Sequence, residues 1–483
     1  MANGLKQKTL KGIGWSFVDD AANQGIRFIV GLVLARLLTP YDFGVVGIAL
    51  IFVAIFEDLS DGGFSNALIQ KKDPTPADYS TAFVVNLSFS SVLYTLLFIL
   101  APYIAVFFAN PDLVLLTRVI SIIIVIDALM FVPKARLTKN LNFKIQTKIS
   151  ITASAISGVV GIVYALMGGG VWALVVQQTV RHLVNTSMLW FVNRNYFSVY
   201  FSKESFVSMF SFGSKILLSE LINSIYRQLY QIVIGKFYTP ALLGQFTRAQ
   251  QFGSLFSKTF TKVVQKVSYP VLSNIQNEKE RLLAAYRTLI KYTMFISFTS
   301  MLMLAAVAKP LILILIGEKW LPSVLFLQIL CFSLMLYPLH AINLNILKVR
   351  GRSDIYLKLE VIKKIIGVVP VLLGVFFNIY YMLIGSVVIE GFISYYLNSS
   401  YSGRLVGYSM IQQIRDILPS FIVALIVSGT VYVFTFLPIN DFIILISQTL
   451  TGFIMLIIIS EFFHIEAYCG MKSLFLNYIK RTT

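Results

Sequence analysis

Two stretches of the chain, residues 20–44 and 220–244, carry the same polar residues at the same spacing. An offset of 200 residues with no gap aligns seven positions by residue class. The aligned pairs are Asp20 and Glu220, Asn23 and Asn223, Arg27 and Arg227, Arg36 and Lys236, Thr39 and Thr239, Pro40 and Pro240, and Gly44 and Gly244. Such an internal duplication is typical of transporters built from two related lobes.

Composition places the chain in a lipid bilayer. Of its 483 residues, 57% are hydrophobic and 13% are charged, with a mean hydropathy of +0.78. A soluble protein carries about 25% charged residues. Because one crossing needs about 20 apolar residues, the apolar segments predict about 14 transmembrane helices. The expected fold is therefore all-α and polytopic, with two six-helix lobes and two extra C-terminal helices.

The repeat also predicts the domain boundaries. Residues 1–200 form an N-terminal lobe of helices 1–6, and residues 201–410 form a C-terminal lobe of helices 7–12. Residues 411–483 hold two accessory helices and a cytoplasmic tail. The apolar run after the basic N-terminal residues is too long for a signal peptide, so we expect it to be retained.

Lysine and arginine predict the orientation of the chain. Alternate loops and helix ends collect 30 of these residues on one side and 4 on the other, which indicates that both termini are cytoplasmic. The net charge of +18 is then mostly a topology signal. The basic residues are spread over many separate segments, so nucleic acid is not an expected partner.

Several kinds of site find no support in the sequence. Cys331 and Cys469 lie far apart in apolar context, which indicates neither a disulfide framework nor a metal site. His182, His340 and His464 are scattered, which also argues against a metal site. The sequence contains no GxGxxG, Walker A or HExxH motif. We therefore expect no cofactor and no enzymatic activity.

Charged residues inside two predicted helices mark a candidate binding cavity. Asp20, Asn23 and Arg27 share one face of helix 1, and their repeat partners form the same stripe on helix 7. A charge at mid-bilayer costs at least ~2.5 kcal/mol, so such residues usually face a bundle interior or a watery cavity. Arginine there can bind a phosphate as a fork. In the structural alternative, Arg27 pairs with Asp20 or Asp127, and Arg227 pairs with Glu220.

Other polar residues extend this candidate cavity. Further candidate cations are Arg181, Lys215 and Arg248. The acidic and amide side chains that could line the cavity or carry a coupling proton or cation are Asp19, Asp20, Asn23, Asp127, Glu220 and Asn223, together with Glu57. These acids make coupling to an H⁺ or Na⁺ gradient a hypothesis. The absence of a nucleotide motif leaves an ion gradient or substrate supply as the driving force.

The repeat is asymmetric at the cytoplasmic ends of helices 2 and 8. Helix 2 ends with Glu57, Asp58 and Asp61, whereas helix 8 carries Lys258, Lys262 and Lys266 in the corresponding region. We expect Asp58 and Asp61 to pair with Lys258 or Lys262 when a cytoplasmic gate closes, as alternating access requires. The alternative is that these lysines contact anionic lipid headgroups.

Four motifs carry a resemblance to a known family. The segments GIGWSF, LARLLTPYDFGVVGIA, DGGFSNALIQKKD and GGGVWALVVQQ resemble the polysaccharide transport family of the multidrug/oligosaccharidyl-lipid/polysaccharide exporter (MOP) superfamily. Within it, the chain is most similar to Wzx-type flippases of O-antigen, capsule or exopolysaccharide synthesis. The resemblance implies translocation of undecaprenyl-diphosphate-linked oligosaccharide from the inner to the outer leaflet of the bacterial cytoplasmic membrane.

The resemblance also implies site residues and partners. Arg27 matches a helix-1 position that binds the diphosphate in related flippases, and Arg227 or Arg248 could serve from the second lobe. The implied partners are the lipid-linked oligosaccharide and membrane lipids. A polysaccharide polymerase and a chain-length regulator are further candidates.

Two other functions are kept as alternatives. A small-molecule or multidrug exporter of the same superfamily would usually have a carboxylate-dominated cavity, whereas this cavity mixes arginines with its acids. A membrane-embedded glycosyltransferase or ligase needs an acidic catalytic residue at a sizeable extramembrane loop. The loops here are too short to favour that class.

Overall fold

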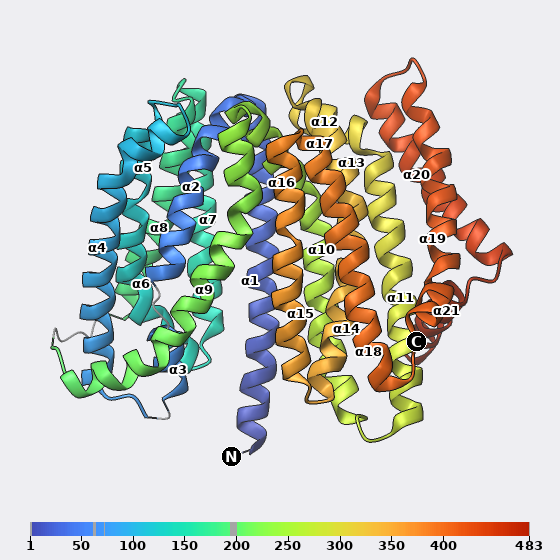
Figure 1. Ribbon diagram of the computed structural model, residues 1–483, viewed down its shortest axis with the longest axis horizontal. Coiled ribbons are helices and arrows are strands. Elements are labelled where there is room, and N and C mark those ends of the chain that lie inside the picture. The colour runs from blue at the N-terminus through green and yellow to red at the C-terminus, as the bar shows by residue number, and fades with distance from the viewer. Residues whose placement is uncertain (1, 61–63, 72, 194–199, 483) are drawn as a thin grey trace. The chain divides into compact units, whose positions relative to one another are not determined.

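A computed structural model describes residues 2–60, 64–71, 73–193 and 200–482. Inside its helices, the side chains of residues 2–10, 13, 64–66, 211–216, 218, 219 and 478–482 are left undescribed. Every regular element in these ranges is a helix (Figure 1). The predicted all-α fold class is confirmed.

Two compact units make up the chain, Met1–Gly244 and Gln245–Thr483. The helices of the first unit are α1 (Ala2–Leu37), α2 (Pro40–Ser60), α3 (Phe64–Gln70), α4 (Pro76–Phe107), α5 (Leu113–Ile120), α6 (Ile122–Lys139), α7 (Phe143–Leu166), α8 (Val171–Val192) and α9 (Lys203–Phe237). In this unit α1 packs on α7, α7 on α8, and α2 on α9. The α2–α9 contact joins a helix of each predicted repeat.

The second unit begins inside α10 (Pro240–Asn274). Its other elements are α11 (Lys279–Ala306), α12 (Ala308–Ile316), η1 (Glu318–Trp320), α13 (Pro322–Leu334), α14 (Tyr337–Val349), α15 (Ser353–Ile366), α16 (Val368–Phe376), α17 (Ile379–Ser386), the π-helical η2 (Val387–Ile393), α18 (Ser394–Val406), α19 (Met410–Val433), η3 (Phe434–Phe436), α20 (Asp441–Phe462) and α21 (Glu466–Thr482). Helix α19 packs on α11 and α20.

The compact units and the sequence repeats follow different boundaries. The repeat divides the chain near residue 200, whereas the first compact unit continues to Gly244 and includes α9. The duplication reflects a repeat in the sequence, whereas the compact units reflect which helices pack together. The division into lobes at 1–200 and 201–410, with 411–483 as an accessory part, stays a prediction.

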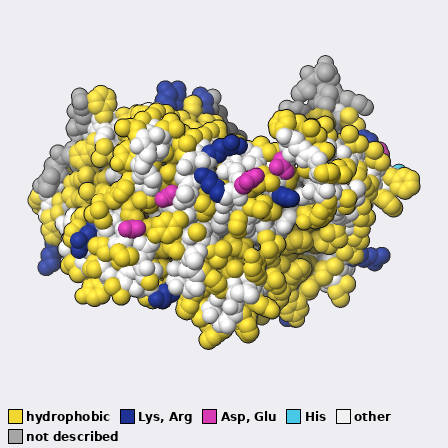
Figure 2. All heavy atoms as spheres, turned by 90° about the horizontal axis from the view of Figure 1, so that it is seen from above, with side chains coloured by type: hydrophobic (Ala, Val, Ile, Leu, Met, Phe, Trp, Pro, Cys, Tyr) yellow, Lys and Arg dark blue, Asp and Glu magenta, His cyan; other side chains and the backbone are white. Residues whose placement is uncertain are grey.

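The surface and helix lengths fit a membrane protein. Within the described ranges, nine stretches are long and apolar enough to cross a bilayer. In α20, only 17% of the apolar 18-residue window is buried inside the protein, the smallest share of the nine. Figure 2 shows hydrophobic side chains over most of the face in view, with few charged ones among them. The chain is therefore a multi-pass membrane protein. The count of about 14 crossings stays a prediction.

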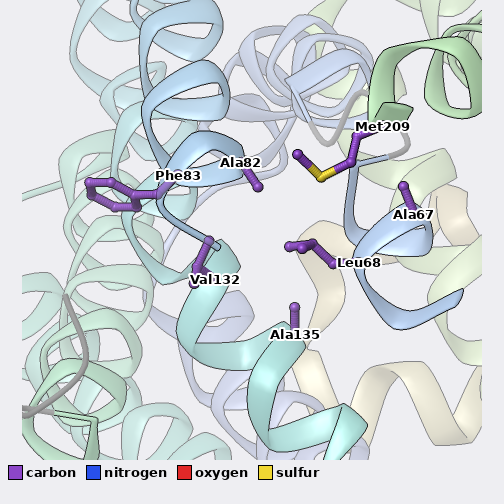
Figure 3. Packing of buried hydrophobic residues seen from close by; sticks show 7 residues of the cluster. All are labelled: Ala67, Leu68, Ala82, Phe83, Val132, Ala135 and Met209. Carbon is purple, nitrogen blue, oxygen red and sulfur yellow. The ribbon is translucent and has the colours of Figure 1, made fainter. Parts of the chain in front are cut away.

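Small and apolar side chains hold the first unit together where α3, α4, α6 and α9 meet. The cluster consists of Ala67, Leu68, Ala82, Phe83, Val132, Ala135 and Met209 (Figure 3). The start of α4 is fixed beside it by a capping box between Thr75 and Asp78, whose carboxylate also bonds Lys71 at 2.8 Å. Small residues allow close helix approach, which drives packing where water supplies little of the force.

The duplicated Thr-Pro motif forms a reciprocal close contact. Pro40 opens α2 and Pro240 opens α10, where the missing N–H costs little. A Cβ added to Gly44 would lie 1.6 Å from the carbonyl oxygen of Pro240. A Cβ added to Gly244 would lie 2.0 Å from the carbonyl oxygen of Pro40. Both glycines are required because each helix start touches the backbone of the other.

Replacing Gly44 with alanine should therefore disrupt this contact. We expect Gly44→Ala to lower the free energy of unfolding by about 1–3 kcal/mol, because the methyl group would overlap backbone atoms. Gly47→Ala is the matched control, since its Cβ would meet nothing closer than Leu243 Cδ2 at 3.8 Å. Thermal unfolding of the purified proteins measures both. Equal melting temperatures for the two variants would contradict the close contact.

Candidate anion-binding site

The polar stripe of α1 splits between two environments. Asn23 is 8% exposed and points at α7. Its Nδ2 donates to Ser150 Oγ at 3.0 Å and to Asp19 Oδ1 at 2.9 Å, and its Oδ1 accepts from Ser154 Oγ at 2.6 Å. Asn23 and Asp19 therefore join α1 to α7, whereas Arg27 and Asp20 are exposed.

Arg27 is accompanied by carboxylates and by a second arginine. Its guanidinium interacts electrostatically with Asp19 and Asp20. Arg181 of α8 lies close enough to Arg27 for the two charges to repel each other. Two adjacent guanidinium groups can together bind an anion in place of the carboxylates that accompany them.

Arg181 also faces a pair of acids. It interacts with Glu57 of α2 and Asp127 of α6. His182, the next residue on α8, bonds Asp127 through Nδ1 at 2.6 Å. One ligand atom from each of Glu57, Asp127 and His182 lies within 4.8 Å of the other two. Because Arg181 already supplies positive charge to these acids, we do not assign this group to a metal.

A third arginine, Arg227, is paired with Asp58, the residue of α2 that follows Glu57. Arg227 of α9 donates to Asp58 Oδ2 at 2.6 Å, and its other terminal nitrogen lies 3.9 Å from Glu220 Oε2. The side chains of Arg227 and Asp58 are 54% and 37% exposed. A pair this open exchanges partners readily, because exposed ion pairs are worth about 0–1 kcal/mol.

The other predicted site residues that the structure describes lie on α9 and α10. Arg248 lies in the second unit, donates to Gln251 and sits 6.0 Å from the ring centre of Trp320. Lys258, Lys262 and Lys266 are exposed on α10. Asn223 is half-buried on α9. Asp61 and the Lys215 side chain lie outside the described residues.

The structure adds residues that the sequence analysis did not select. His182, Ser150 and Ser154 all bond candidate residues, yet none of them stands out by spacing. An ionisable residue inside a predicted crossing is itself a signal of function, and by that rule His182 could have been found. Its partner Asp127 is 55 residues away and could not be found from local spacing.

Comparison with known proteins supplies relatives. A family model described as "Polysaccharide biosynthesis protein" matches residues 33–325. The chain is 26% identical to the succinoglycan biosynthesis transport protein ExoT of Rhizobium meliloti, over 66% of this chain and 65% of that protein. It is 25% identical to the lipopolysaccharide biosynthesis protein WzxC of Escherichia coli, over 77% of this chain and 76% of that one.

Solved structures show the same fold. The lipid II flippase MurJ in an inward closed conformation superposes with a TM-score of 0.74 at 17% identity, covering 94% of this chain and 99% of MurJ. An inward-facing multidrug resistance transporter of the MATE family gives a TM-score of 0.59 at 16% identity, covering 86% of this chain and 98% of that chain. At such low identity these likenesses establish the fold alone.

Asn23 offers a test of which polar residues are structural. Asn23→Leu should lower the free energy of unfolding by about 1–3 kcal/mol, because it leaves the buried Ser154 Oγ of α7 without its acceptor. Gln24→Leu, at the exposed neighbouring position, should stay within about 0.5 kcal/mol. Thermal unfolding of the purified variants measures both. A fully stable Asn23→Leu protein that loses transport would instead place Asn23 in the cavity.

Proposed function

The chain belongs to the family of polysaccharide biosynthesis proteins, and on that premise we propose that it is a flippase for undecaprenyl-diphosphate-linked oligosaccharide. It moves the repeat unit from the inner to the outer leaflet of the bacterial cytoplasmic membrane. The transported unit serves the synthesis of O-antigen, capsule or exopolysaccharide. Both termini lie in the cytoplasm in this proposal.

The arginines of the first unit carry the proposal. Arg27, Arg181 and Arg227 project from three helices, and carboxylates accompany each of them. An anionic diphosphate can replace those carboxylates, because guanidinium binds phosphate and carboxylate oxygens in the same forked geometry. We assign these three residues to the diphosphate head. Arg248 and Lys215 remain proposed contributors from the sequence.

The names of the relatives support a polysaccharide precursor as substrate. ExoT is named for succinoglycan transport, WzxC for lipopolysaccharide biosynthesis, and TuaB of Bacillus subtilis for teichuronic acid biosynthesis. These polymers differ, whereas a lipid-linked precursor is a substrate class that all three pathways can share. A polysaccharide polymerase and a chain-length regulator are proposed partners.

The energy source is also part of the proposal. The MATE transporters share this fold, and we propose coupling to an H⁺ or Na⁺ gradient in place of nucleotide hydrolysis. Candidate ion-binding groups are Asp19, Asp20, Glu57, Asp127 and Glu220. No catalytic residue is assigned, since family membership and fold point to transport.

Loss of the arginines should stop transport. In cells lacking this chain, lipid-linked repeat units should accumulate and surface polysaccharide should be lost. Wild type should restore both, whereas Arg27→Ala, Arg181→Ala and Arg227→Ala should each reduce surface polymer at least about tenfold, because a charge-assisted bond is worth about 1.5–3 kcal/mol. Lipid extraction with mass spectrometry measures the accumulated intermediate.

Arg281→Ala is the matched control, because Arg281 is 69% exposed and pairs with Glu278. If all the arginine variants restore surface polymer, the flippase proposal stands and the arginines have a structural role. Drug sensitivity without accumulated intermediates would favour a small-molecule exporter. If cells lacking this chain fail to add a sugar to the lipid-linked intermediate, a glycosyltransferase or ligase would be favoured.

The proposed cytoplasmic gate has its own test. Asp58→Lys and Lys258→Asp should each impair transport, and the double reversal should restore it if these residues pair when the gate closes. Because Asp58 bonds Arg227 in this structure, Asp58→Arg with Arg227→Asp is the competing double reversal. Polymer export at matched protein levels measures both. If the Asp58/Lys258 double variant is no better than its singles, the gate hypothesis fails.

A further inference from the structure

A polar pocket lies in the second unit, where α10 and α14 end at the same edge (Figure 1). Its volume is about 570 Å³, and six polar residues bound it, Tyr269, Ser273, Gln276, Asn277, Lys348 and Arg350. Ligand pockets in proteins typically measure about 300–1,000 Å³. None of the described residues that bound this pocket is acidic. The pocket therefore presents two cations and several neutral hydrogen-bond donors to a ligand.

Arg350 is held in position without being neutralised. Its Nη1 donates to the Gln276 carbonyl at 2.9 Å and its Nη2 donates to the Leu405 carbonyl at 3.3 Å. These bonds tie the ends of α10 and α18 to the end of α14. A guanidinium has more N–H donors than these two bonds use, and the carbonyls carry no formal charge. Because the group is already fixed, it loses little conformational entropy on binding an anion.

Lys348 is the second cation of the pocket, and its side chain is exposed. Its Nζ lies 4.7 Å from the centre of the Tyr356 ring on α15. A contact of this kind orients the ammonium group over the ring face and leaves its charge in place. Within the part of the chain that the structure describes, neither Lys348 nor Arg350 forms an ion pair.

The carboxylates nearest to these cations along the chain already have partners. Glu278 pairs with Arg281 at 3.1 Å, and Asp354 pairs with Arg352 at 2.8 Å. The positive charge of the pocket is therefore not balanced by either neighbouring acid. Two cations that line one pocket concentrate positive potential there and attract an anion.

The start of α15 places this pocket at the level of lipid headgroups. Leu357, Val361 and Ile365 are 65%, 47% and 66% exposed, and their spacing puts them on one face of α15. In a multi-pass membrane protein, an exposed apolar face of this kind contacts lipid tails. Ser353, the first residue of α15, lies only about 6 Å along the helix axis from Leu357. The pocket thus lies where the apolar face ends, and tyrosines such as Tyr356 are enriched at that level.

We propose that this pocket binds the phosphate group of an anionic phospholipid, from the leaflet that the lysine and arginine distribution predicts to be cytoplasmic. Arg350 and Lys348 contact the phosphate, and the side-chain amides of Gln276 and Asn277 donate to its remaining oxygens. The acyl chains follow the exposed apolar face of α15. The lipid stabilises the second unit, because it binds only where these helix ends are packed together.

This inference does not depend on the flippase proposal. The pocket uses none of the residues assigned to the transported diphosphate, and all of its residues belong to the second unit. Binding is non-covalent and reversible.

Titration of lipids onto the purified full-length protein in detergent tests the proposal. Native mass spectrometry counts the bound lipids and gives a dissociation constant for each step. Wild type should bind one phosphatidylglycerol at least about fivefold tighter than a phosphatidylcholine of the same chain length, and phosphatidylglycerol should raise its melting temperature. Lys348→Gln and Asn277→Asp should each weaken that step about fivefold, because the first removes a cation from the pocket and the second adds a carboxylate to it.

Each pocket variant has a matched control. Lys144→Gln removes an exposed lysine of the first unit that also lies over an aromatic ring, 5.7 Å from the centre of Trp15. Asn274→Asp adds an acid at an exposed position of α10 outside the pocket. Both controls should bind phosphatidylglycerol as wild type does. Lys348 and Asn277 are exposed, so their variants should fold, and thermal unfolding without lipid checks this.

Three outcomes would overturn the proposal. Equal affinity for the two phospholipids, or equal weakening in the pocket and control variants, would show that no specific headgroup site exists here. Displacement of phosphatidylglycerol by an equal concentration of inorganic phosphate would assign the pocket to a soluble phosphate. A preference for undecaprenyl diphosphate over phosphatidylglycerol that Lys348→Gln abolishes would assign it to the transported lipid.

Discussion

Pairing between guanidinium and carboxylate groups is the constraint on which the first unit depends. An unpaired charge in a membrane-embedded bundle costs several kcal/mol, so an arginine persists there only with a partner or with water. Helix α2 supplies two such partners in succession, since Glu57 faces Arg181 of α8 and Asp58 bonds Arg227 of α9. The packing of α2 against α8 and α9 therefore also fixes where Arg181 and Arg227 lie.

The same physics separates fixed polar contacts from exchangeable ones. Asn23 has its amide satisfied by groups of α1 and α7, and no ligand can replace those bonds without disturbing the helix contact. Arg227 and Asp58 are both substantially exposed, and their pair can dissociate at low cost. Binding of an anion followed by its release requires contacts of the second kind. The pair of Arg227 and Asp58, which joins α9 to α2, is of this kind.

The sequence shows which charged residues lie inside apolar helices, though not which groups they contact. An arginine inside an apolar helix is visible in the sequence, as Arg27 and Arg227 are. The repeat predicts that Asp58 and Asp61 pair with Lys258 or Lys262 when a gate closes. In this structure Asp58 bonds Arg227, 169 residues away, a contact that the repeat does not predict. The bond between His182 and Asp127 cannot be read from local spacing, because the two residues are 55 positions apart. Such partners depend on which faces of α2, α6 and α8 meet, and helix rotation is not encoded in the spacing of one helix.

The sequence by itself determined the membrane-embedded all-helical class, the duplicated Thr-Pro motif and the presence of charges inside the bundle. These follow from hydropathy and periodicity, which act along a single segment. Tertiary structure alone decided that Gly44 and Gly244 each touch the backbone of the opposing helix start. It also decided which arginine each carboxylate holds. Both outcomes depend on atoms that are distant in the chain and become neighbours only when the helices pack.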